Sequence, residues 1–425
     1  MRRNARGTGV GRWRTRDRPW RRPRLWGVVA VVVALQVAGC GGGGTITDPS
    51  PLSRGAASTA EGPVSASAVV EGLGAPLPVR PVGHVSLADL VVHAVGITPA
   101  GDLWVAGAAR WNRATLGLYG EWFVDPLATG VWHGTYGKPG TWYPMGSVEG
   151  LTVGPDGRVW VITGTALATF DQGTWRRVLG PGGAVLSGVS GQIGGAPSLA
   201  VGPDGWVWAV GPTFDTMVRF DGGVTVLSGP GWAADGAVCG IGTVAATAHG
   251  TAWTADANPW GYRGCLLRWD GATWTRERPL GLTELSIYRL ASDTDGGLWA
   301  WLLTCEADEN AWAAGRIPDA CRRAQLAHFD GSDWTLRSDG PWSGQESADI
   351  SMAAVNGYLW FAVNGRLFLF DGDEFLPVSV PPSVDLPVTA VLAAVPDGSV
   401  DSAGTAWVTT SDGALHRLPA VPAAH

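Results

Sequence analysis

The side chains that could do chemistry are few and scattered along this sequence. Seven histidines occur, without a His-x-His or His-Glu-x-x-His motif among them: His84, His93, His133, His249, His328, His416 and His425. A Gly-x-Ser-x-Gly elbow and a Gly-rich phosphate loop are also missing. The acidic run Glu306, Asp308 and Glu309 could touch a cation, but a solvated loop explains it better. The motifs therefore predict no catalytic residue, no metal site and no cofactor.

Cysteines suggest a different kind of chemistry. Four follow residue 40: Cys239, Cys265, Cys305 and Cys321. In an exported chain an even number predicts disulfides, here with three possible connectivities. Cys305 and Cys321 bracket one insertion, so we expect them to pair, which leaves Cys239 for Cys265. A zinc site is the rival, but no Cys-x-x-Cys spacing supports it.

Aromatic side chains gather in the long stretches between predicted strands. The candidate ligand face consists of Trp111, Trp122, Trp132, Trp260, Tyr262 and Trp312. Exposed aromatics among polar residues suggest a surface that recognises carbohydrate, peptide or protein. The alternative is that these side chains pack the loops onto the body of the domain.

An internal repeat shows what carries these loops. An apolar strand, a Pro-Asp-Gly turn and a strand with tryptophan follow one another in Val153–Trp160 and again in Val201–Trp208. This repeat unit recurs, with variations, around seven tryptophans: Trp104, Trp160, Trp208, Trp253, Trp299, Trp360 and Trp407. Successive tryptophans of this set are 56, 48, 45, 46, 61 and 47 residues apart. We expect these tryptophans to fill the spaces between units, and the aspartates to form turns rather than bind ligands.

A second turn completes most units. Asp-Gly joins two apolar runs, as in Phe329–Trp334 and Phe370–Phe375. This pair signals a hairpin because the turn needs positive φ. Each unit then has four short strands. Seven such units, most about 47 residues apart, predict an all-β fold, a seven-bladed β-propeller with four-stranded blades.

The ends of the repeat suggest how the ring closes. The last unit ends at its third strand, near Leu418, without a further hairpin. The segment Leu77–Val85 resembles the fourth strand at Phe375–Val380. We therefore expect this N-terminal strand to complete the last blade and remove two open edges.

The repeat resembles the two-component-regulator propeller and, more loosely, WD40-like and YVTN-like blades. In that family a Gly-x-Leu-Trp-Val strand follows an Asp-x-x-Gly turn. The units around Trp104, Trp160, Trp208 and Trp299 match this pattern well, and the others are degenerate. The resemblance implies the fold and says little of function, because such propellers serve unrelated roles.

The N-terminus predicts export. A basic stretch precedes the apolar run 25–35, which is shorter than the roughly 20 residues of a transmembrane helix and fits a secretory signal. The run is followed by Val37-Ala38-Gly39-Cys40, which resembles the bacterial lipobox. The resemblance implies that Cys40 becomes a lipidated N-terminus, with palmitate among its acyl chains. Arg21-Arg22 leaves open whether export is general or twin-arginine.

These observations divide the chain into four parts. We expect a lipoprotein signal peptide at 1–40, a disordered Gly/Ser/Pro/Ala tether at 41–82, the propeller at 83–420 and a tail at 421–425.

The predicted function follows from the parts. Beyond the basic N-terminus the chain is acidic, which argues against a nucleic-acid partner. We expect a monomer anchored in the cell membrane on the extracytoplasmic side, a non-catalytic binding, scaffold or sensory module. Its partner would be an envelope protein, peptide or carbohydrate. The alternative is a propeller enzyme, a lyase or hydrolase, with a site assembled from several blades at the central channel.

Overall fold

The computed structural model describes the following residues: 70–71, 73–110, 129–146, 148–163, 166–179, 199–210, 216–228, 242–247, 250–255, 265–279, 285–293, 296–304, 323–337, 340–342, 350–380, 387–395 and 404–419. All described residues lie within the unit Ala60–His425. The predicted signal peptide, Cys40 and the C-terminal tail therefore lie outside the described residues.

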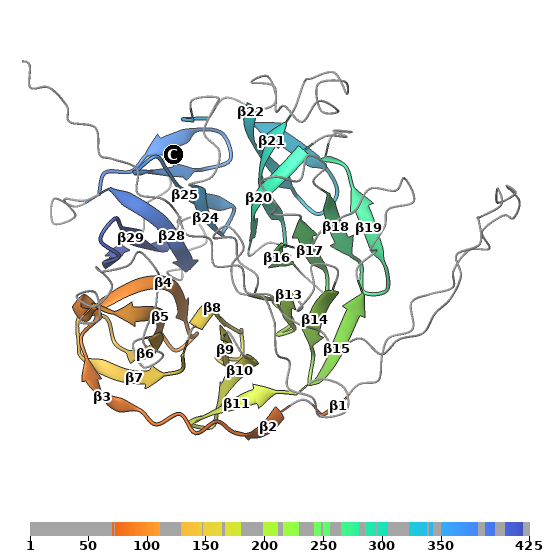
Figure 1. Ribbon diagram of the computed structural model, residues 1–425. Coiled ribbons are helices and arrows are strands. Elements are labelled where there is room, and N and C mark those ends of the chain that lie inside the picture. The colour runs from red at the N-terminus through yellow and green to blue at the C-terminus, as the bar shows by residue number, and fades with distance from the viewer. Residues whose placement is uncertain are drawn as a thin grey trace, which may run out of the picture. The chain divides into compact units, whose positions relative to one another are not determined.

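Seven antiparallel sheets follow one another around a central axis (Figure 1). In blades 1 to 3 the strands are β4 (Leu90–Ile97), β5 (Leu103–Ala109), β6 (Thr129–Gly134), β7 (Gly140–Pro144); β8 (Val148–Val153), β9 (Val159–Thr163), β10 (Ala166–Asp171), β11 (Thr174–Val178); β12 (Leu199–Val201), β13 (Val207–Val210), β14 (Thr216–Phe220) and β15 (Gly223–Ser228).

Blades 4 to 7 continue the pattern. Their strands are β16 (Thr243–Ala246), β17 (Ala252–Ala255), β18 (Leu266–Trp269), β19 (Trp274–Glu277); β20 (Leu285–Ser292), β21 (Leu298–Thr304), β22 (Arg323–Phe329), β23 (Trp334–Arg337); β24 (Ile350–Val355), β25 (Tyr358–Val363), β26 (Arg366–Phe370), β27 (Phe375–Pro377); β28 (Val388–Val395), β29 (Thr405–Thr410) and β30 (Leu415–Leu418). The prediction of an all-β, seven-bladed propeller is confirmed. A single turn of 3-10 helix, Leu87–Asp89, precedes β4, and no described helix is long and apolar enough to cross a membrane.

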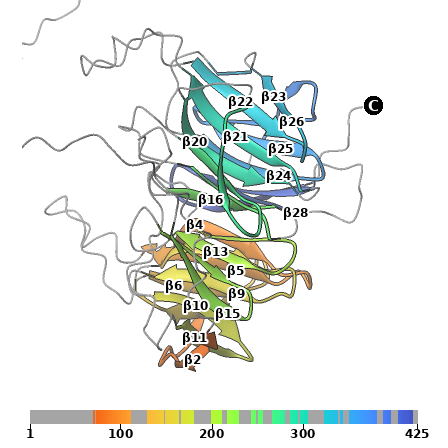
Figure 2. The same cartoon turned by 90° about the vertical axis from the view of Figure 1, so that its right-hand side faces the viewer.

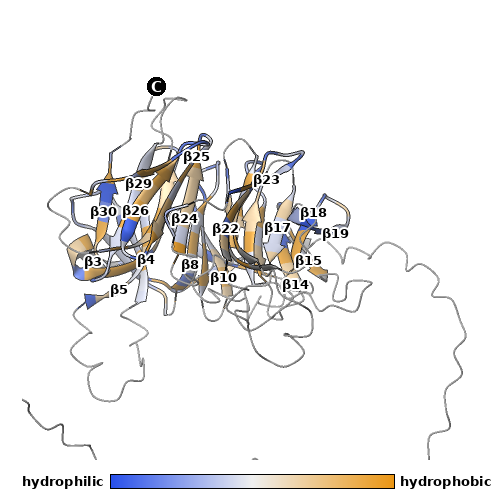
Figure 3. Ribbon diagram, turned by 90° about the horizontal axis from the view of Figure 1, so that it is seen from above, coloured by the Kyte–Doolittle hydropathy of each residue, from blue (hydrophilic) through white to orange (hydrophobic). Residues whose placement is uncertain are grey.

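The apolar residues of each strand pack between blades rather than within them. Seven clusters of buried side chains each join two neighbouring blades, including the last and the first. Figure 2 shows the sheets from the side, and Figure 3 shows that their strands are mostly hydrophobic. All seven repeat tryptophans, called the blade tryptophans below, lie on the second strand of their blades with at most 6 % of their surface exposed.

The turn aspartates serve the backbone. Asp156 and Asp204 accept hydrogen bonds from backbone N–H groups in their own Pro-Asp-Gly turns. In the hairpin after β22, the N–H groups of Asp333 and Ser332 lower the pKa of Asp330 to about 2. Such bonds favour the charged carboxylate and fix the turn.

The N-terminal segment runs along the outer rim, contrary to two expectations. We call Val70–Val85 the arm. Its strand β3 (Val82–Val85) pairs with β7 of blade 1, β2 (Leu73–Pro76) with β11 of blade 2, and β1 (Val70–Glu71) with β15 of blade 3 (Figure 1). The folded part thus begins before residue 83, inside the predicted tether. Main-chain pairing needs no apolar pattern, so a Gly- and Pro-rich segment can add to an existing edge.

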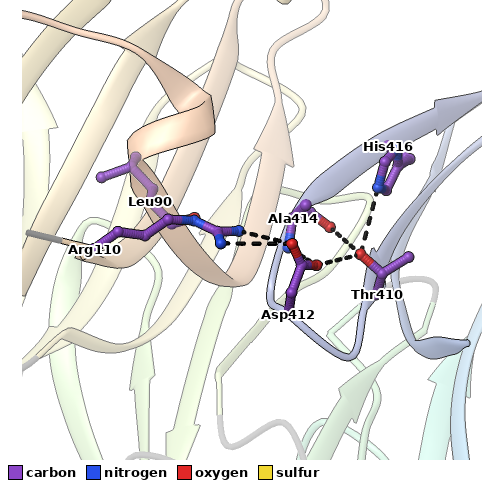
Figure 4. A network of polar contacts seen from close by, with 6 residues as sticks. All are labelled: Leu90, Arg110, Thr410, Asp412, Ala414 and His416. Carbon is purple, nitrogen blue, oxygen red and sulfur yellow. Dashed lines mark hydrogen bonds and ion pairs between the residues drawn. The ribbon is translucent and has the colours of Figure 1, made fainter. Parts of the chain in front are cut away.

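The predicted closure by an N-terminal strand in the last blade is wrong. The arm pairs with blades 1 to 3, and the last sheet has three strands among the described residues. Side chains and one backbone hydrogen bond join blade 7 to blade 1 instead, at a boundary we call the seam (Figure 4). Arg110 donates to the Leu90 carbonyl at 2.9 Å and reaches Asp412 at 3.4 Å. The Val92 N–H donates to the Gly413 carbonyl at 3.0 Å.

Candidate functional site

Polar residues on the innermost strands form the first candidate site, around the axis. In four blades the first strand carries one extra residue, a β-bulge, at the same level. The first strand pairs with the strand that carries the blade tryptophan. The extra residue lies between the two residues of the first strand that pair with the second and third residues after that tryptophan. These extra residues are His93, Glu149, Tyr288 and Thr389. All four are polar, in strands otherwise rich in Val, Leu and Ala. Bulges redirect side chains and are common beside active sites.

His93 shows the consequence of its bulge. Its neighbour Val92 packs in the seam cluster while Ala94 packs toward blade 2. The imidazole also turns toward blade 2, where Nε2 lies 2.7 Å from the Val148 carbonyl. A carbonyl only accepts, so Nε2 carries the proton and Nδ1 keeps its lone pair. Desolvation by burial lowers the pKa of His93, against the Val148 bond that raises it, which favours the neutral ring.

Similar bonds tie other blades together near the axis. Arg289 Nε donates to the Ile350 carbonyl at 2.9 Å, from blade 5 to blade 6. The Ser351 hydroxyl donates to the Val391 carbonyl at 2.7 Å, from blade 6 to blade 7. Three polar side chains of innermost strands, His93, Arg289 and Ser351, thus form hydrogen bonds with the next blade. Some of the polar side chains on the innermost strands are therefore structural.

The motif search did not single out these residues. A signal was present: the bulged residue precedes its tryptophan by 11 positions in three blades (104 − 93, 160 − 149 and 299 − 288). The fourth, Thr389, falls outside this spacing because the turn of blade 7, residues 396–404, is longer and β28 has a second register shift.

Two other histidines belong to the blades. His133 and His328 stack on Trp104 and Trp299 across neighbouring strands, each with ring centroids 4.0 Å apart. Burial lowers the pKa of both rings, against nearby aspartates that raise it. They extend the aromatic filling between blades. No group of three or more His, Cys, Asp or Glu that could hold a metal occurs among the residues that the structure describes.

The second candidate site is the predicted aromatic face, and the structure corrects one member. Trp132 lies on β6, not in a loop. It is fully buried in the seam cluster, and its Nε1 donates to the Val85 carbonyl at 2.8 Å. The strand begins at Thr129, so the insertion ends earlier than the sequence indicated. Trp111, Trp122, Trp260, Tyr262 and Trp312 lie outside the described residues.

The cysteines are described in one case. Cys265 immediately precedes β18, is 1 % exposed and is disulfide-bonded. Its partner is not among the described residues, which also leave out Cys239, Cys305 and Cys321. The pairing of Cys239 with Cys265, and of Cys305 with Cys321, stays a prediction.

Comparisons with known proteins find similar solved structures. No family model matches the chain, and no curated protein matches its sequence. Similar solved structures include virginiamycin B lyase from Staphylococcus aureus, in a catalytically inactive form with quinupristin, at 12% identity and TM-score 0.49, covering 81% of this chain and 99% of that chain.

Another similar structure is the extracellular domain of a protein described as a hybrid two-component system from B. thetaiotaomicron, at 12% identity and TM-score 0.47, covering 80% of this chain and 39% of that one. The Dos1 propeller has 11% identity and TM-score 0.45, covering 81% and 86%. At these identities and scores the likenesses carry no argument about function.

Proposed function

We propose that this protein is a propeller held by lipid on the extracytoplasmic side of a bacterial membrane, where it binds another molecule without transforming it. It would act as a recognition, scaffold or sensory module. An envelope protein, peptide or carbohydrate is the expected kind of partner.

The observation that carries this proposal is the difference between the two faces of the ring. On one face, which carries the turns between first and second and between third and fourth strands, residues 396–404 form the longest connection. On the other face the connections include residues 110–128, 179–198 and 305–322. Loops on a rigid scaffold are where binding residues concentrate. Of the predicted aromatic face, Trp111, Trp122 and Trp312 belong to these connections.

The arm supports the anchoring part of the proposal. Because β1, β2 and β3 pair with the rims of three blades, the chain that leads from Cys40 joins the ring at its outer edge. The described arm thus attaches through outer strands rather than through the connections 110–128 and 305–322. Export is also the setting in which a disulfide at Cys265 persists.

Cell fractionation of the full chain tests the anchor. Wild-type protein should stay with the membrane after a salt wash, and the Cys40→Ser variant should be released into the soluble extracytoplasmic fraction. Cys265→Ser is the control that keeps the lipid site. Release of both variants alike, or of neither, would contradict the lipid anchor.

Capture from a detergent extract of the envelope tests the binding face. The wild-type full chain should retain a partner that the combined variant Trp111→Ala, Trp122→Ala and Trp312→Ala loses at least about tenfold. The control, Asp373→Ala, changes an exposed residue on the opposite face. Equal capture by all three proteins would contradict the proposal.

The enzyme alternative has one observation in its favour. His93 has a neutral ring, a fixed tautomer and an acceptor Nδ1 on an innermost strand, as a general base requires. His93→Gln keeps a donor for the Val148 carbonyl. A partner molecule that is chemically changed by the wild type and merely bound by this variant would favour the enzyme.

A further inference from the structure

Blade 7 differs from all other blades at its outer edge. Blades 4 to 6 end in a fourth strand, blades 1 to 3 carry a fifth from the arm, and blade 7 ends at its third strand, β30, among the described residues. A third strand normally uses both edges of its backbone. Here one edge of β30 has no described strand beside it.

The register shows which backbone groups this edge presents. Thr410 N–H donates to the Ala414 carbonyl at 3.1 Å, so this pair is hydrogen-bonded. Pairs alternate along an antiparallel ladder, so the next pair, Thr409 with Leu415, is not. His416 then bonds to β29, and Arg417 does not. The N–H and C=O groups of Leu415 and Arg417 therefore point away from β29, toward the open edge.

An exposed aromatic side chain stands beside these groups. Tyr136, in the turn after β6, is 41 % exposed and is the one large hydrophobic side chain classed as exposed among the described residues. Its ring meets Trp407 edge-on with centroids 5.1 Å apart. Its hydroxyl lies 3.5 Å from the Leu415 carbonyl, at the limit of a hydrogen bond. The Leu415 carbonyl is thus only weakly engaged.

Two exposed basic side chains flank this edge, in a chain whose net charge is −7. Arg417 is exposed on β30 and lies on the same side of the strand as Leu415, which packs toward blade 1. Lys138, the only lysine of the chain, is exposed two residues after Tyr136 in the same turn. No described acidic side chain forms an ion pair with either of these basic groups.

We propose that the edge of β30 is a docking site for an extended peptide with acidic side chains, which adds to blade 7 as its fourth strand. The peptide backbone pairs with Leu415 and Arg417, and Tyr136 covers one of its side chains. Alternate side chains of a strand share one face, so acidic residues at every second position meet Arg417 and Lys138 together. The inference rests on the proposed binding function and gives it a partner chemistry.

Fluorescence anisotropy with the detergent-solubilised full chain tests this site. The probe is a labelled peptide of alternating Thr and Glu, about eight residues long, the size of an ordinary strand. Two matched peptides are controls: one has Lys in place of Glu, and one is N-methylated so that it cannot donate along one edge. We expect the first peptide to bind, and each control to bind at least about tenfold more weakly.

Variants of Arg417 separate backbone from charge. Arg417→Ala keeps the outward N–H, and Arg417→Pro removes it without taking a bond from β29. Proline should weaken binding about three- to tenfold more than alanine, as expected for one hydrogen bond. Tyr136→Ala should weaken binding of the peptide. The double variant Lys138→Ala with Arg417→Ala should abolish the salt dependence of peptide binding. If Arg417→Pro unfolds the protein, the N-methylated peptide tests the same backbone pairing with β30 on the wild-type chain.

Several results would overturn the inference. The first is equal binding of the N-methylated and parent peptides, and the second is equal binding of the Lys and Glu peptides. The third is a wild-type chain that sediments as a dimer and that Arg417→Pro dissociates, because a second copy would then occupy the edge. The variant with Trp111, Trp122 and Trp312 replaced should bind the peptide normally. Equal envelope capture by the wild type and this variant, with normal peptide binding, would refute the proposed face alone. Capture that only this variant loses, with no peptide binding by the wild type, would refute this site alone.

Discussion

The rim of this propeller is built in two ways. In blades 1 to 3 the arm adds main-chain pairing outside the fourth strand, including a bond from Leu77 N–H to the Trp175 carbonyl at 2.7 Å. At the seam, blade 7 meets blade 1 through side chains, a single backbone hydrogen bond from Val92 to Gly413 and one close approach of a turn. The difference teaches that, among the described residues, the ring does not close by sharing a strand. Stability at the seam then depends on a few particular side chains, which substitution can test.

The largest effect is expected where the arm and the seam meet. Trp132 is fully buried in the seam cluster and donates to the Val85 carbonyl of the arm. Trp132→Ala should lower the free energy of unfolding by about 3–5 kcal/mol, because it leaves a cavity and an unpaired carbonyl. Denaturant unfolding of the full chain measures this. Trp132→Phe, which mainly removes the hydrogen bond, should cost much less, and equal losses would show that burial is not the cause.

A glycine substitution tests the close approach at the seam. Gly413 has φ +78°, and an added Cβ would lie 2.5 Å from a methyl carbon of Val91 in blade 1. Gly413→Ala should cost about 1–3 kcal/mol, from overpacking and left-handed strain together. Gly372→Ala is the control, since that residue also has positive φ but open space around it. If both cost the same, the seam is not tightly packed there.

The blades, the arm and the seam also show what the sequence could and could not predict. The blade tryptophans and the Asp-Gly hairpins were recognisable because local chemistry demands them, and they gave the fold class. The arm was misplaced because edge pairing uses backbone groups that every residue has. Trp132 was assigned to a loop because a long insertion blurs the start of the next strand. The seam has no sequence motif, since Gly413 and Val91 meet only in the closed ring.

Acidification should weaken blade 1 and blade 5 through buried histidines. Burial lowers the pKa of His93, His133 and His328 below the ordinary histidine value of 6.5. The unfolded chain then binds more protons than the folded one, so stability is full above about pH 6.5 and falls as the pH drops below it. The thermal midpoint between pH 8 and pH 5 measures the loss.

Single substitutions assign this pH dependence. His328→Gln and His133→Gln should each flatten the pH profile of the midpoint, by at most one proton per histidine. His93→Gln should do the same while keeping the tie to Val148. A profile that keeps its slope in all three variants would show that other groups, such as the aspartates of the turns, govern acid unfolding.

The smallest effect is expected from the ion pair that marks the seam most visibly. Arg110 and Asp412 lie 3.4 Å apart with side chains 26 % and 36 % exposed, so water screens their attraction. Asp412→Asn, which keeps an acceptor for Thr410 and the Ala414 N–H, should cost about 0.2–1 kcal/mol, and less in high salt. Arg110→Ala should cost more, because Arg110 also bonds the Leu90 carbonyl. If Asp412→Asn costs as much as Gly413→Ala, electrostatics rather than packing holds the seam.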